Sequence, residues 1–126
     1  MKIAVISCCK TKIKADKKVK ARDLYNSDLF NKSLAFCLEK YDQVFILSAK
    51  YGLLSLADKI KTYDLTLNKF SIKEKKEWSK KVVDNFKKCF KEDDVIYFHC
   101  GVNYRKYIIE DISNKTHTPL KGLGLG

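Results

Sequence analysis

Residues 44–52 read VFILSAKYG, an apolar run that ends abruptly in a cluster of polar residues. Two other segments repeat this arrangement, IAVISCCKTK at 3–12 and VIYFHCG at 95–101. Continuous β-branched and aromatic runs are typical of strands buried on both faces, as in parallel sheets. Ligands bind in the crevice beyond the carboxyl ends of such strands. We therefore expect the three polar clusters to meet along one edge of the sheet and to form the site there.

The rest of the chain alternates helices with these strands. Apolar spacing and capping signals predict three helices: from Asn26 or Ser27 to about Tyr41, from Ser71 to about Phe90, and from 101–103 to near Ser113. Ser71 and Glu74 form a capping box at the start of the second helix. Residues 11–21 are expected to be a lysine-rich loop and 53–67 to be irregular, with a further strand around 61–67 or in the tail 116–126. The expected fold is α/β, a single three-layer domain with a small, mainly parallel β-sheet flanked by helices.

Length and composition restrict the class of protein. With 126 residues, 45% of them hydrophobic, the chain suits one ordered domain spanning residues 1–126. No apolar run approaches the roughly 18–20 residues that span a bilayer, and no signal-peptide segment precedes the first strand. The five cysteines include no C-x-x-C pair, so we expect reduced thiols and no metal site, with Cys37 and Cys89 buried on helix faces. The sequence predicts a cytoplasmic protein with no membrane partner and no cofactor.

The charge balance favours anionic partners. The chain has 26 Lys and Arg against 15 Asp and Glu, a formal net charge of +11. Such a charge favours nucleic acids or phosphorylated small molecules. A solvated lysine surface without a binding role is an equally good interpretation. Only Arg22 and Arg105 are arginines, so any nucleic-acid contact is expected to be electrostatic and non-specific.

The first polar cluster offers groups that can hold an oxygen atom. Ser7, Cys8 and Thr11 supply small polar side chains beside free amides, and Lys10 or Lys12 supplies charge. The glycines of a P-loop are missing. A thiol beside lysines is also a candidate nucleophile. The alternative is a tight turn whose thiols are structural.

The second cluster is the most specific segment. Lys50 and Tyr51 directly follow a buried strand, and Gly52 then turns the chain. Tyr51 is suited to stacking on a base, and Lys50 to pairing with a phosphate or a developing negative charge. A lysine that only extends to solvent is the alternative.

Further candidates lie around these clusters. Asp64, next to Tyr63 in a segment of unclear structure, can bind a sugar hydroxyl, stabilise a glycosyl cation or activate water, or merely cap a turn. His99 ends the third strand and titrates near neutrality, although such a histidine is often only hydrogen-bonded. Arg22 precedes the first long helix together with Tyr25 and can bind a phosphate or form a surface ion pair.

Five ordered motifs resemble a small bacterial and phage family of unknown function, described as YaaA-like or "peroxide stress protein"-like. They are SCCKTK at 7–12, ARDLY at 21–25, ILSAKYGLL at 46–54, YDLTL at 63–67 and PLKGLG at 119–124. The resemblance implies an α/β fold and a connection to nucleobases or DNA, because YaaA proteins are linked to DNA protection under oxidative stress and similar domains accompany base-modifying enzymes. Cys9 stands where serine is more usual, and Tyr51 where histidine is common. The chain stops where relatives usually continue, so the resemblance implies an incomplete C-terminal element.

These observations lead to one main hypothesis, a protein that binds a nucleobase, nucleoside or nucleotide and acts at an N-glycosidic bond. Asp64 would stabilise the sugar cation, while Lys50 and Ser48 would hold the phosphate or the departing base. Tyr51 or Tyr63 would stack on the base. Ser7, Cys8 and Lys10 would complete the floor of the site.

Two other hypotheses remain open. One is a non-catalytic DNA-binding or stress-protection module, in which a lysine stripe along the second long helix follows the phosphates. The stripe comprises the lysines at 73, 76, 80, 87 and 91. The other is a nucleotide sensor or sponge, which would use the same pocket as the enzyme without turnover.

Overall fold

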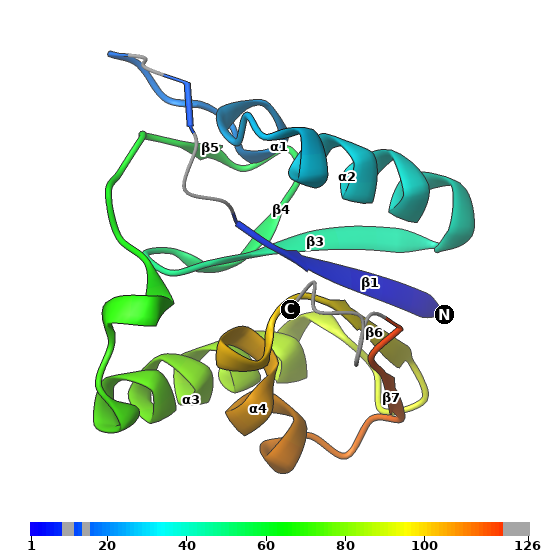
Figure 1. The fold of residues 1–126 in the computed structure, drawn as a ribbon. Helices are drawn as coiled ribbons and strands as arrows, with labels where there is room; N and C mark the ends of the chain where they lie inside the picture. Colours follow the sequence, from blue (N-terminus) through cyan, green and yellow to red (C-terminus); the bar gives the residue numbers. More distant parts are fainter. Residues whose placement is uncertain (9–11, 14–15, 120–126) are drawn as a thin grey trace.

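The computed structural model describes residues 1–8, 12–13 and 16–119. Its main sheet has the strand order β4-β3-β1-β6-β7 (Figure 1). The strands are β1 Lys2–Ser7, β3 Gln43–Ser48, β4 Gly52–Ser55, β6 Val95–His99 and β7 Thr116–His117. β3, β1, β6 and β7 run parallel, whereas β4 is antiparallel to β3. This confirms the predicted α/β domain with a mainly parallel sheet.

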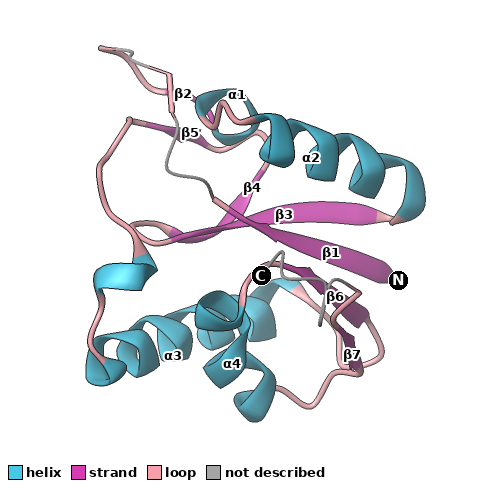
Figure 2. Cartoon of the chain, viewed as in Figure 1, coloured by secondary structure: helices cyan, strands magenta, loops and turns pink. Residues whose placement is uncertain are grey.

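Helices cover both faces of the sheet, so the domain has three layers (Figure 2). α1 Ala21–Leu24 and α2 Asp28–Lys40 lie on one face, and α3 Ile72–Cys89 and α4 Val102–Asp111 on the other. Side chains alternate along β1, so Ile3 and Val5 join the core under α3 and α4, whereas Ala4 and Ile6 join the core under α2. Burial on both faces explains why these strands read as unbroken apolar runs.

The helix starts agree with the capping signals. Ser27 caps α2 by accepting a hydrogen bond from the Phe30 amide at 3.0 Å. At α3, the Ser71 side chain accepts from the Glu74 amide at 3.1 Å while Glu74 accepts from the Ser71 amide at 2.9 Å, which is the predicted capping box. All three predicted helices are confirmed.

The segments between the clear elements hold more structure than expected. Residues 53–67, expected to be irregular, contain most of β4, the short strand β5 Lys59–Ile60 and the start of the 3-10 turn η1 Leu67–Lys69. The expected loop 11–21 contributes β2 Val19–Lys20, which pairs with β5. A further strand was expected around 61–67 or in the tail, and β7 lies in the tail. Strands this short take their structure from a neighbour, and they leave almost no periodicity in the sequence.

One expected burial is wrong. Cys37 is fully buried, but Cys89, at the last position of α3, is exposed. Phe90 takes the inward position instead, because its ring packs against Phe45 and Phe86, with centroids 5.0 Å away in both cases. Within the described residues, no helix combines the length and apolarity needed to cross a membrane.

Candidate functional site

The carboxyl ends of β1 and β6 enclose the crevice where a ligand of this fold is expected. The chain leaves β1 toward α2 on one face and leaves β6 toward α4 on the other, which makes this the topological switch point of the sheet. Cys8 continues β1 beyond its end, and its amide donates to the Leu47 carbonyl at 2.8 Å. Its Sγ lies 3.3 Å from the hydroxyl of Tyr104, in the first turn of α4.

A chain of three hydroxyl groups lies beside this crevice. Ser48, with no exposed surface, has its Oγ 2.7 Å from the Tyr63 hydroxyl, which is in turn 2.7 Å from the hydroxyl of Tyr25. The same Oγ accepts hydrogen bonds from the amides of Lys50 and Tyr51 at 3.2 and 3.0 Å. Ser48 thus holds the 48–51 turn and the segment around residue 63 against the end of β3.

Burial keeps the two tyrosines nearest the crevice protonated. Loss of solvent raises the pKa of Tyr63 far above its usual range, with the nearby Cys8 and Tyr25 adding to the effect. Burial likewise raises the pKa of Tyr104, again with a contribution from Cys8. Both phenols are therefore hydrogen-bonding groups at neutral pH, and neither is a phenolate base.

A small cleft opens from this cluster to the surface, with a volume of about 50 Å³. The described residues that line it are Cys8, Lys12, Asp64, Leu65, Thr66, Lys69 and Tyr104. The Lys12 ammonium lies 4.4 Å from the centroid of the Tyr63 ring, a cation–π distance. The cleft therefore combines an exposed carboxylate, Asp64, with two ammonium groups and a phenol. Its volume suits one small group, well below the roughly 300 Å³ at which pockets hold whole small molecules.

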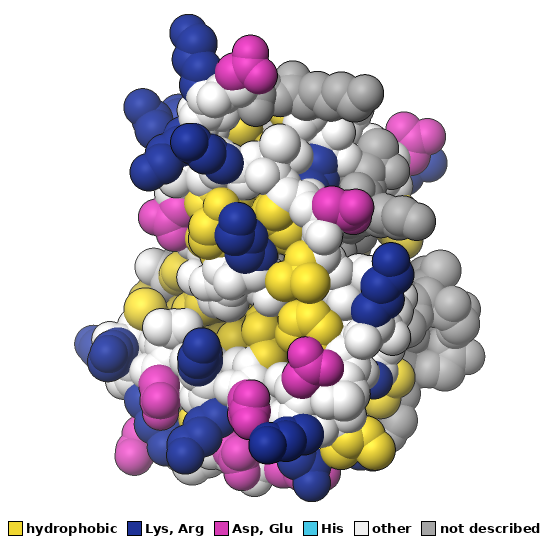
Figure 3. Space-filling view, turned by 90° about the vertical axis from the view of Figure 1, so that its left-hand side faces the viewer, with side chains coloured by type: hydrophobic (Ala, Val, Ile, Leu, Met, Phe, Trp, Pro, Cys, Tyr) yellow, Lys and Arg dark blue, Asp and Glu magenta, His cyan; other side chains and the backbone are white. Residues whose placement is uncertain are grey.

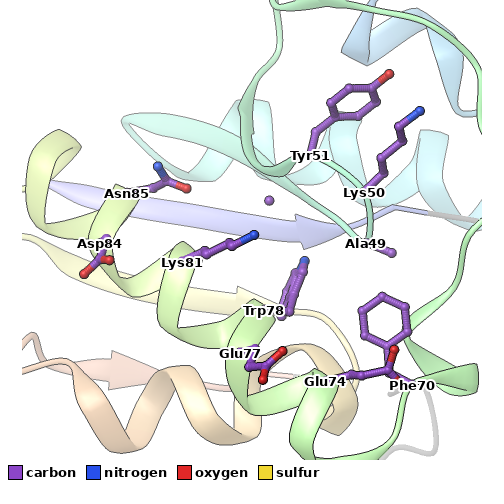
Figure 4. A pocket seen from close by; sticks show the side chains of 11 residues that line it. Ala49, Lys50, Tyr51, Phe70, Glu74, Glu77, Trp78, Lys81, Asp84 and Asn85 are labelled. Atoms are coloured by element: carbon purple, nitrogen blue, oxygen red, sulfur yellow. The ribbon is translucent and has the colours of Figure 1, made fainter.

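A larger groove of about 540 Å³ separates the 49–52 turn from α3 (Figure 4). Lys50 and Tyr51 rise from the turn away from α3, and Lys81 extends from the helix toward it. Trp78, at the base of the groove, donates from Nε1 to the Ser48 carbonyl at 3.0 Å. Lys50 and Asp64 therefore line different hollows.

The charges along this groove are mixed. Lys50 and Lys81 line it together with three acidic residues, Glu74, Glu77 and Asp84. The Glu74 carboxylate is engaged in the capping box, and the Ser71 amide lowers its pKa. Basic and acidic side chains are also interspersed over the lower half of the face that Figure 3 shows, where Figure 1 places α3.

The structure divides the predicted site residues into groups. Around the hydroxyl chain and the cleft it brings together Cys8, Tyr25, Ser48, Tyr63 and Asp64. On the groove side lie Lys50, Tyr51 and Gly52. Lys10 and Thr11, like Cys9 and residues 120–124 of the last motif, lie outside the described residues. Ser7 is half-buried at the end of β1.

Two predicted residues do not join the cluster. His99 points to the α2 face, where its Nε2 lies 2.7 Å from the Tyr41 hydroxyl, and burial lowers its pKa. His99 follows the alternation of β6, which directs it away from the side of Cys100. Arg22 is an exposed residue of α1 whose amide donates to the Leu56 carbonyl.

Four lining residues of the cleft, Leu65, Thr66, Lys69 and Tyr104, were not singled out from the sequence. Tyr104 had a usable signal, because it occupies the first turn of the helix that follows β6. Thr66 and Lys69 had none, since the path of residues 61–70 depends on tertiary packing. In the part of the chain that the structure describes, no group of three or more His, Cys, Asp or Glu side chains could hold a metal ion.

Comparison with known proteins adds a family but no activity. No curated protein matches the chain. A family model, described as "Family of unknown function (DUF6884)", matches residues 3–126, so the match includes β1, β3 and β6 together with the cleft and the groove. The chain therefore belongs to the DUF6884 family, a family of unknown function.

Proposed function

We propose that the protein binds a nucleoside or nucleotide at the carboxyl edge of the sheet and acts at its N-glycosidic bond, with Asp64 as the catalytic carboxylate. The observation that carries this proposal is the cleft at the β1–β6 switch point, where Asp64 shares the lining with Lys12, Lys69 and Tyr104. A carboxylate beside ammonium groups suits a substrate that combines a phosphate with a sugar.

The size of the cleft indicates how such a substrate would sit. About 50 Å³ accommodates one group, so the phosphate or the sugar enters while the rest lies over the rim. Lys12 and Lys69 neutralise the phosphate, and Asp64 faces the sugar carbon. Lys50 lines the separate groove, so in this proposal it contacts the outer part of the substrate rather than the reacting bond.

The chemistry needs only water as a second reactant. The bond between C1′ and the base nitrogen breaks, and its electron pair leaves with the base, which takes up a proton from solvent. The sugar becomes an oxocarbenium ion that the Asp64 carboxylate stabilises. A water molecule adds to C1′ and gives its proton to Asp64, which returns it to solvent. Ser48, Tyr63 and Tyr25 hold the segment that carries Asp64 in position.

The motifs SCCKTK, ILSAKYGLL and YDLTL, which resemble YaaA-like proteins, support a connection with nucleobases or DNA. Their residues also contribute to the hydroxyl chain and the cleft. A cytoplasmic protein with reduced thiols suits this role, and we include that location in the proposal.

The test is a thermal-shift screen with nucleobases, nucleosides and nucleotides, followed by chromatographic detection of the released base. A ligand at about 100 times its dissociation constant should add about 2.7 kcal/mol to the stability of the folded state. We expect Asp64→Asn to bind the ligand and to release no base. Asp111→Asn, an exposed substitution at the far end of α4, is the matched control and should be fully active.

The same assay separates binding from turnover. Lys12→Ala and Lys69→Ala should weaken binding of a nucleotide more than that of the corresponding nucleoside, because they remove the partners of the phosphate. Lys32→Ala, at an exposed position of α2, should change the binding of neither the nucleotide nor the nucleoside. Base release by Asp64→Asn at the wild-type rate would refute the catalytic role. If the wild type binds a ligand without any turnover, the enzyme hypothesis is contradicted, and the hypothesis of a nucleotide sensor or sponge is the one that fits.

A further inference from the structure

A third hollow, beside the starts of α3 and α4, is distinct from the cleft and the groove. It has a volume of about 220 Å³ and is lined by Ile72, Lys75, Val102, Asn103, Lys106 and Tyr107. Ile72 and Val102 are the first residues of α3 and α4, so the hollow lies where the two helices begin. None of the described residues that line it is acidic, in contrast to the groove on the other side of α3.

Two lysines contact one aromatic ring at this hollow, and a third lysine lines it. The Lys106 ammonium lies 5.3 Å from the centroid of the Tyr107 ring, and the Lys76 ammonium 5.5 Å from it. Both are within the range of cation–π attraction. Lys75 is held in place by a hydrogen bond from its Nζ to the Asn103 side chain at 3.2 Å. Asn103 is fixed in turn by donating to Asn68 at 2.8 Å.

The rim of the hollow is apolar and open to solvent. The side chain of Ile72 is 63% exposed and that of Val102 is 48% exposed. An aromatic ring, two exposed aliphatic side chains and a group of ammonium ions form the combination that binds single-stranded nucleic acid. The ring and the aliphatic groups contact the faces of unstacked bases, and the ammonium ions follow the phosphates. A duplex, whose bases are stacked, makes use of the ammonium groups alone.

We propose that this hollow, the α3–α4 surface, binds single-stranded nucleic acid without sequence specificity, with Tyr107 as the stacking residue and Lys75, Lys76 and Lys106 as phosphate contacts. The net charge of +11 favours the same class of partner. Of the lysine stripe expected from the sequence, the α3–α4 surface uses only the N-terminal end, where Lys76 lies beside Tyr107. Further along α3, Glu77 and Asp84 interrupt the positive charge. The proposal does not depend on catalysis at the cleft.

The test measures binding of a short fluorescent oligothymidylate strand by anisotropy, over salt concentrations from about 50 to 200 mM. Each lost phosphate contact lowers the slope of log affinity against log salt by about 0.7 for a single strand. We expect this reduction for Lys76→Ala and for Lys106→Ala. Lys32→Ala, an exposed charge on the opposite layer, should retain the wild-type slope.

The aromatic role is tested separately from the charge. Tyr107→Ala should weaken binding by about ten-fold at every salt concentration, since it removes a stacking contact and no charge. Tyr107→Phe keeps the ring and should bind like the wild type. Wild-type slopes in both lysine variants, or equal affinity for single strand and duplex with no effect of Tyr107→Ala, would overturn the proposal. If polyglutamate with the same number of charges as the strand displaces it, the proposal is also overturned, because the surface would then prefer an acidic protein partner.

Discussion

Replacing Ser48 by alanine tests whether one hydroxyl group holds the site together. The substitution removes the acceptor of the Lys50 and Tyr51 amides, at 3.2 and 3.0 Å, and one of the two hydroxyl partners of Tyr63. Ser48 has no exposed surface, so water cannot readily replace its Oγ. Tyr63 keeps its contact with Tyr25. The damage is therefore concentrated in the 48–51 turn.

The magnitude follows from the groups left without a partner. A buried donor without an acceptor costs about 1–3 kcal/mol. Lys50 is exposed and Tyr51 is half-buried, so the amide of Lys50 is the easier one to solvate, and the amide of Tyr51 bears most of the penalty. We expect the free energy of unfolding to fall by about 2 kcal/mol. A domain of this size changes its melting temperature by about 4 °C per kcal/mol, which gives a decrease of about 8 °C.

Urea unfolding followed by tryptophan fluorescence measures this change, because the chain has a single tryptophan and its Nε1 donates to the Ser48 carbonyl. Ser113→Ala, at an exposed position, is the control and should cost less than about 0.5 kcal/mol. A loss as small as this for Ser48→Ala would refute the reasoning. Combined with Tyr63→Phe, Ser48→Ala should show a coupling energy of about 0.5 kcal/mol or more, and simple additivity would contradict the proposed hydroxyl chain.

Three further perturbations have defined outcomes. Gly52→Ala places a side chain at φ +74° and should cost about 1–2 kcal/mol in urea unfolding. Gly101→Ala, at φ −71°, should show no such backbone strain and should lose only the N-cap preference for glycine over alanine. Burial lowers the pKa of His99 below 6.5, so the unfolded state binds more protons than the folded state near this pH. The free energy of unfolding should therefore fall as the pH drops below 6.5. Unfolding midpoints at about pH 7.5 and pH 5.5 should differ less in His99→Gln than in the wild type. Burial raises the pKa of the Cys37 thiol to about 11, whereas Cys89 is exposed. In a thiol-labelling experiment, Cys89→Ser should remove one fast-reacting thiol, and Cys37→Ser should remove none.

Local patterns in the sequence predicted the frame of the molecule. The runs ending at Ser7, Ser48 and His99 identified three buried parallel strands, because burial on both faces requires apolar residues at every position. The capping residues Ser27 and Ser71 marked helix starts, since they satisfy amides within their own first turn. Such signals act over a few residues and can be recognised without knowledge of the fold.

The composition of the site could be predicted only in part. Cys8 and Ser48 follow strands and were expected at the carboxyl edge, and Asp64 was expected to contribute a carboxylate there. His99 likewise stands at the carboxyl end of a strand, yet its side chain is hydrogen-bonded to Tyr41 on the α2 face. Successive residues of a strand point to opposite faces, and position alone did not indicate which face a strand-end side chain would take.

The sequence by itself determined the α/β class and the parallel strands, because apolar periodicity and capping are local properties. Only the tertiary structure decided that Asp64 and Lys50 line separate hollows, that Tyr104 closes the cleft over Cys8, and that lysines from α3 and α4 meet at Tyr107. These arrangements join residues as far apart as 8 and 104. Contacts of that kind depend on how layers pack, and no local pattern in the chain encodes them.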